Sequence, residues 1–114
     1  MKKFEKSSAD VISIFSRITS KIDCERKKMF GYPVLFLNGN MFLGTFANKM
    51  FFRLRKERHT YWKDRNNAIK DFEPISGRKM KEYLEIECEE RNIGLIEEMK
   101  TESEEYVRTL EIKK

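Results

Sequence analysis

The sequence has few of the residues on which disulfide frameworks, zinc sites and general-base catalysis depend. Among its 114 residues are two cysteines, Cys24 and Cys88, and one histidine, His59. A structural zinc site needs about four Cys or His ligands, so these three residues are too few to form one. The opening MKKFEKSSAD is charged and lacks the apolar segment of a secretory leader. We therefore expect a cytoplasmic protein with reduced thiols and without a metal or other cofactor.

The sequence also lacks a recognisable catalytic constellation. General-base catalysis needs a partner that orients the base and a nucleophile or substrate within reach, and nothing in the sequence marks such a set around His59. The glycines Gly31, Gly39 and Gly44 fit neither the dinucleotide-binding nor the Walker spacing. We therefore expect no enzymatic activity.

One segment has the length of a membrane span but not its character. Residues 29–48 carry no charge. They are interrupted at their centre by Asn38-Gly39-Asn40, and Asn-Gly is a strong signal for a hairpin turn. The segment therefore predicts two strands, 29–37 and 41–47, buried on at least one face, and no contact with a membrane.

Apolar spacing and turn residues predict the remaining elements. Three segments have the features of helices, and two more alternate with the period of a strand. The expected helices are 8–23, 57–66 and 92–111, and the expected strands are 50–55 and 79–88. Extended chain is also expected to restart at Phe72-Glu73-Pro74. Ser7 or Ser8 is placed to cap the first helix. Residues 1–114 thus predict one α+β domain with an antiparallel sheet and N-terminal, middle and C-terminal helices, in the order α-β-β-β-α-β-β-α.

The net charge of +5 is unevenly distributed along the chain. Residues 49–81 hold eleven basic and four acidic side chains, whereas residues 82–114 hold five and eleven. Six basic residues lie around the aromatic pair Tyr61-Trp62 and form a candidate surface for a polyanion or a protein partner. They are Arg53, Arg55, Lys56, Arg58, Lys63 and Arg65. Three interpretations stay open: an ordinary charged surface, weak nucleic-acid binding without sequence specificity, and pairing with the acidic end of a second copy.

Glu82 is an acidic residue in an apolar register. The alternation in 79–88 places it on the same strand face as Met80 and Leu84. Burial of a carboxylate without a partner would destabilise the folded state by an amount on the order of several kcal/mol. We therefore expect Glu82 to take part in an ion pair or a hydrogen bond.

Several short motifs follow one another along the chain. The first is Met29-Phe30-Gly31, and the second is Asn38-Gly39-Asn40-Met41-Phe42. The third consists of Phe72, Glu73, Pro74, Gly77, Arg78, Met80, Glu82 and Tyr83. In order and spacing, over residues 25–112, these motifs resemble the TfoX N-terminal domain family, named after the bacterial competence regulator TfoX/Sxy.

The resemblance carries implications for fold and function. It implies a fold similar to that of type III secretion chaperones, and by analogy with that class a homodimer. It implies no catalytic residues. We therefore expect a non-enzymatic regulatory or protein-interaction domain, with weak nucleic-acid binding through residues 53–65 as the alternative.

Overall fold

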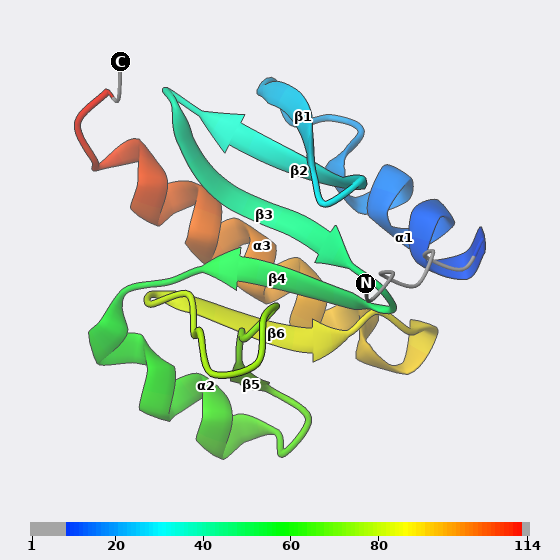
Figure 1. Ribbon diagram of the computed structural model, residues 1–114, viewed down its shortest axis with the longest axis vertical. Helices are drawn as coiled ribbons and strands as arrows, with labels where there is room; N and C mark the ends of the chain where they lie inside the picture. Colours follow the sequence, from blue (N-terminus) through cyan, green and yellow to red (C-terminus); the bar gives the residue numbers. More distant parts are fainter. Residues whose placement is uncertain (1–8, 113–114) are drawn as a thin grey trace.

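A computed structural model describes residues 9–112. Six strands form one antiparallel sheet in the spatial order β1-β2-β3-β4-β6-β5, and three helices accompany it (Figure 1). The strands are β1 (Glu25–Met29), β2 (Tyr32–Leu37), β3 (Asn40–Phe46), β4 (Lys49–Arg53), β5 (Lys70–Asp71) and β6 (Tyr83–Glu87). The helices are α1 (Ala9–Thr19), α2 (His59–Arg65) and α3 (Ile93–Arg108), with short 3-10 turns η1 (Lys56–Arg58) and η2 (Glu90–Asn92) before α2 and α3. The α+β class and the antiparallel sheet are confirmed.

α1 ends earlier than the expected helix 8–23. The side chain of Arg26 donates to the carbonyl of Thr19 at 2.6 Å and so satisfies one of the last carbonyls of the helix. Because Arg26 belongs to β1, the start of the sheet fixes the end of the helix. The predicted N-terminal cap, Ser7 or Ser8, lies outside the described residues.

The sheet contains one strand more than the sequence predicts. β1 has the sequence ERKKM with four exposed residues, so it lacks the apolar alternation from which a strand is recognised. It is followed by Phe30 and Gly31, whose φ angles are 55° and 85°. Two successive positive φ values are typical of a type I′ hairpin turn, which here joins β1 to β2. The expected strand 29–37 is therefore the end of one strand, a turn and a second strand.

The expected hairpin turn lies at Asn38-Gly39, with φ angles of 52° and 81°, and it joins β2 to β3 as predicted. The middle and C-terminal helices also lie within the expected ranges 57–66 and 92–111. α3 is the longest helix described, with 16 residues. Within residues 9–112, no helix combines the length and the apolar character that crossing a bilayer requires.

β6 begins later than the expected strand 79–88. Glu82 has a φ of 71°, which takes the chain out of the extended conformation just before the strand. Leu84 and Ile86 belong to the main core, whereas Met80 packs against a second cluster of apolar residues. The prediction that Met80 and Leu84 share a face is wrong, because the break at Glu82 separates them.

Apolar side chains pack on both faces of the sheet. The main core contains buried residues from all three helices together with residues from the strands. In Figure 1, α3 runs behind β3 and β4, and the segment 72–82 passes in front of the sheet. On that front face Val34, Phe51 and Phe72 form a smaller buried cluster. The helices therefore cover one face, and the segment 72–82 packs on the other.

Candidate functional site

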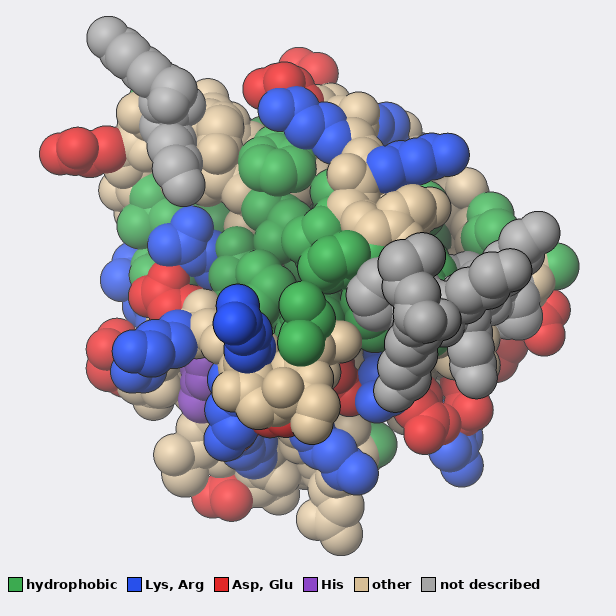
Figure 2. All heavy atoms as spheres, viewed as in Figure 1, with side chains coloured by type: hydrophobic (Ala, Val, Ile, Leu, Met, Phe, Trp, Pro, Cys, Tyr) green, Lys and Arg blue, Asp and Glu red, His purple; other side chains and the backbone are tan. Residues whose placement is uncertain are grey.

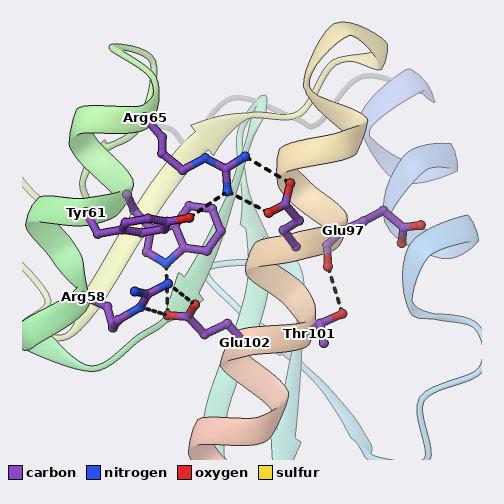
Figure 3. A network of polar contacts seen from close by, with 8 residues as sticks. Arg58, Tyr61, Arg65, Glu97, Thr101 and Glu102 are labelled. Atoms are coloured by element: carbon purple, nitrogen blue, oxygen red, sulfur yellow. Dashed lines mark hydrogen bonds and ion pairs between the residues drawn. The ribbon is translucent and has the colours of Figure 1, made fainter.

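The basic segment, residues 53–65, runs from the end of β4 through η1 into α2 and lies beside α3 (Figure 3). Arg58 and Arg65 each present two guanidinium nitrogens to one carboxylate of α3. Arg58 binds Glu102 at 3.1 and 2.9 Å, and Arg65 binds Glu98 at 2.7 and 3.1 Å. Such paired donors match both oxygens of a carboxylate. Two of the best anion-binding groups of the segment thus bind carboxylates of the same chain.

The two aromatic residues of this segment have different surroundings. Trp62 is only 2% exposed, and its indole N–H donates to Glu102 at 3.0 Å. Tyr61 is 43% exposed, and the guanidinium of Arg58 lies 4.0 Å from the centre of its ring. Trp62 is therefore a core residue, whereas a guanidinium group already lies over the ring of Tyr61.

These contacts keep the carboxylates of α3 charged. The hydrogen bond from Arg65 holds the pKa of Glu98 below its usual range. At Glu102 burial raises the pKa, but hydrogen bonds from Arg58 and Trp62 outweigh burial, so that the pKa is lowered. The hydrogen bond to Glu102 in turn raises the pKa of Arg58. Charged pairs therefore connect η1 and α2 to α3 beside a buried tryptophan.

Three further basic residues of the segment differ in their partners. The ammonium of Lys63 lies 2.6 Å from Asp71, at the end of β5. The guanidinium of Arg55 lies 4.6 Å from the ring centre of Tyr106 and within 3.4 Å of a threonine hydroxyl. Lys56 is exposed, and within the described residues neither it nor Arg55 has a carboxylate partner. Only part of the predicted surface is therefore available to an external anion.

Glu82 joins three elements at the end of the segment 72–82. Its carboxylate accepts hydrogen bonds from Arg53 of β4 at 2.8 Å and from the hydroxyl of Tyr106 of α3 at 2.7 Å. Its backbone carbonyl accepts from the N–H of Leu54 at 2.7 Å. Burial raises the pKa of Glu82, but the two side-chain hydrogen bonds outweigh it, and the pKa lies below its usual range. Glu82 thus has the partners expected of it, and one of them is a fourth ion-paired member of the basic segment.

His59 contacts the backbone of the chain, and Cys88 is a buried free thiol. A ring nitrogen of His59 lies 3.0 Å from the carbonyl of Leu54. Burial raises the pKa of Cys88 to about 11, which keeps this thiol protonated near neutral pH. Cys88 borders a hollow of about 380 Å³ between α1 and the end of β6. Among the described residues, His, Cys, Asp and Glu side chains nowhere gather in a group of three or more that could hold a metal ion.

The sheet face opposite the helices carries a second group of apolar side chains. At its centre Val34 is buried beside Phe51 and Phe72, whose rings stack with their centres 4.2 Å apart. Partly buried apolar residues surround this centre: Met29, Phe36, Met41, Phe46, Met80 and Tyr83. Figure 2 shows apolar side chains as a continuous green area over β2, β3 and β4. We refer to the surface formed by Met29, Phe36, Met41 and Met80 as the methionine face.

The apolar character of this face is unusual for its place in the fold. An antiparallel sheet with helices on one face commonly presents polar side chains on the other. Here β2, β3 and β4 place apolar side chains on both faces. Three of the four members of the methionine face are methionines, whose side chains remain partly exposed. From the sequence these methionines are evident only as motif residues, because the surface that they form with Phe36 depends on tertiary packing.

The motif residues of the family resemblance shape the chain around this face. Gly31 and Gly77 have φ angles of 85° and 80°, a conformation that glycine adopts readily in turns. Glu73 accepts a hydrogen bond from the N–H of Gly77 at 2.7 Å. The hydroxyl of Tyr83 donates to the carbonyl of Met41 at 2.7 Å and so connects β6 to β3. The motifs therefore account for turns and packing around the methionine face.

Comparison of the chain with family models, with curated proteins and with solved structures found no match. The resemblance to the TfoX N-terminal domain family therefore rests on the motifs themselves.

Proposed function

We propose that this chain is a non-enzymatic protein-interaction domain that binds a partner through the methionine face. The observation that carries the proposal is an apolar, methionine-rich surface on the sheet face opposite the helices. Contiguous exposed apolar patches on soluble domains mark interaction sites, and unbranched thioether side chains adapt to partners of different shape. A regulatory role, as the resemblance to TfoX N-terminal domains implies, would act through such an interaction.

Selection of random-peptide phage on the immobilised full-length chain tests this proposal. We expect the enriched peptides to bind the wild type and to lose binding to Met41→Asp, with Met29→Asp as a second variant on the same face. Ile12→Asp is the matched control, because Ile12 is an apolar residue of α1 that is 50% exposed. Circular dichroism and the fluorescence of Trp62 check that each variant is folded. Failure to enrich any peptide, or binding that Met41→Asp leaves unchanged, would contradict the proposal.

We also propose a cytoplasmic location. Cys24 and Cys88 are both free thiols. Thiols persist in reducing compartments, whereas small secreted domains typically carry disulfides. Alkylation of intact cells, followed by mass spectrometry of the isolated protein, should find both cysteines unoxidised.

Weak nucleic-acid binding through the basic segment is the alternative proposal. Arg55 and Lys56 are exposed and would be the groups that contact phosphates. The ion pairs of Arg58 and Arg65 weigh against this function, because phosphate binding would first have to break their contacts with α3. Retention on DNA at low salt that is lost when Arg55 and Lys56 are replaced by Glu would support it. Absence of retention at low salt would reject it.

The structure limits which surface the homodimer that is expected by analogy could use. Pairing of the basic segment with the acidic end of a second copy would compete with the contacts that Arg58 and Arg65 already make within the chain. A dimer would therefore have to use another surface. Sedimentation velocity of the wild type and of Met41→Asp, at increasing protein concentration, shows whether that surface is the methionine face.

A further inference from the structure

The flanks of the methionine face are basic. On one side lies β1, where Lys27 is exposed on the same strand face as Met29. On the other side lies the segment 72–82, whose residues Arg78, Lys79 and Lys81 are exposed. Acidic residues are fewer in these two segments: Glu25, Glu73 and Glu82. A partner that reaches across the face from one flank to the other would meet positive charge on both sides.

Much of this positive charge lacks an internal counter-charge, whereas most cations of the basic segment are paired. In the described part of the chain, Arg78 and Lys81 have no carboxylate within 4 Å, and Lys27 approaches an exposed glutamate of its own strand at 3.8 Å. By contrast, Arg58 and Arg65 are each bound by a carboxylate of α3. The nearby acidic side chains have other roles. Glu73 accepts a backbone hydrogen bond, and Glu82 is held by an arginine and a tyrosine. The flank cations are therefore available to an external anion.

The aromatic rings of this surface are already engaged, which favours a protein over a nucleic acid as the partner. The ammonium of Lys27 lies 4.7 Å from the ring centre of Phe36, and Phe51 and Phe72 stack on each other. Base recognition on single strands depends on aromatic faces that can receive a base. Between the basic flanks lie partly exposed methionine side chains, which instead pack well against irregular apolar groups.

We propose that the methionine face binds an acidic segment of a partner protein, with apolar side chains that pack on the methionines and carboxylates that pair with Lys27, Arg78 and Lys81. The inference rests on the proposed protein-interaction function and adds the chemistry of the partner. Complementary charge at the rim of an interface raises the association rate and selects among partners, while the apolar centre supplies most of the affinity. The preference for acidic segments should therefore weaken as salt rises.

Three fluorescent probes test this inference on the full-length chain. Two are helical peptides with the same leucine spacing, one with Glu and one with Lys at every polar position, and the third is single-stranded oligothymidine. By fluorescence anisotropy, we expect the acidic peptide to bind at least about tenfold more tightly than the basic one at low salt. The difference should shrink at high salt, and Met41→Asp should abolish binding of the acidic peptide.

Two matched triple variants assign the charge effect to the flanks. Lys27→Glu, Arg78→Glu and Lys81→Glu together should weaken binding of the acidic peptide by at least about tenfold. The control replaces Lys21, Arg55 and Lys56 by Glu, which changes the net charge equally on exposed residues elsewhere. This control should leave the affinity close to that of the wild type.

The alternative outcomes separate this inference from the proposed function. Equal binding of both peptides that Met41→Asp abolishes would overturn the charge preference and leave the protein-interaction function standing. Tighter binding of oligothymidine, lost in the flank triple variant, would overturn it in favour of nucleic acid. Failure of both peptides to bind would also overturn it, and the phage selection then decides the proposed function separately. A dimer that Met41→Asp dissociates would make a second copy the occupant of the face.

Discussion

Substitution of Glu82 separates the contribution of its side chain from the cost of its backbone conformation. A φ of 71° at a residue with a Cβ costs on the order of 1 kcal/mol, and glycine relieves this cost. The carboxylate offsets the cost by binding Arg53 and Tyr106 at 2.8 and 2.7 Å. We therefore expect the free energy of unfolding to fall least for Glu82→Gln, more for Glu82→Gly and most for Glu82→Ala.

The geometry gives approximate magnitudes for this order. A hydrogen bond to a charged group contributes about 1.5–3 kcal/mol when shielded from water. The side chains of Arg53 and Glu82 are 24% and 25% exposed, which reduces the contribution of their pair. We expect a loss of about 3 kcal/mol for Ala, about 2 kcal/mol for Gly because the strain is relieved, and about 1 kcal/mol for Gln, which retains a neutral acceptor.

Urea unfolding followed by the fluorescence of Trp62 measures these differences, because Trp62 is the only tryptophan and is buried. The pKa of Glu82 is lowered in the folded state. Its contribution is therefore present above the ordinary glutamate pKa and is lost as the pH falls through the folded-state pKa. The wild type and Glu82→Gln should converge in stability in acid. Equal stability of the Ala and Gly variants would refute the strain argument, and wild-type stability of Glu82→Ala would refute the role of the carboxylate.

Three further predictions concern packing, acid stability and thiol reactivity. Gly44→Ala should lower the free energy of unfolding by about 1–3 kcal/mol in urea titrations, because the added methyl would lie 2.6 Å from a side-chain carbon of β2; an unchanged midpoint contradicts this. The lowered pKa values of Asp71 and Glu102 predict that stability, measured by thermal unfolding, falls as the pH drops below the ordinary carboxyl range. In the native protein Cys24 should react with iodoacetamide before Cys88, which is buried and has a pKa of about 11; mass spectrometry of partly alkylated protein gives the order.

Apolar spacing predicts the elements that pack on the main core, because burial of one face imposes the period. In α3, Met99 and Val107 are buried, and the helix lies within the expected range 92–111. β1 is not predicted, because neither of its faces is buried in the main core. It is an edge strand with exposed, charged side chains, and edge strands carry charge because it discourages pairing with other chains. Such a strand has no apolar period to recognise.

The sites depend on contacts between distant residues, which the sequence does not encode locally. The uncharged segment 29–48 predicts strands buried on at least one face, but the packing of Phe72 on the second face is a tertiary contact. The basic residues of η1 and α2 are evident from composition, yet the partners of Arg65 and Arg58 lie 33 and 44 positions away on α3. Positive φ at Glu82 has no sequence signal, because glutamate rarely adopts it.

The opposite charges of the middle and the end of the chain are matched largely within the molecule. An ion pair inside one chain forms without the loss of translational freedom that association with a second copy would cost. The pairs between α2 and α3 therefore have an advantage over the same pairs formed between copies. This internal pairing changes which basic residues a partner can meet. Arg58 and Arg65 are occupied, whereas Arg78 and Lys81 border an apolar surface and keep their charge for an external carboxylate.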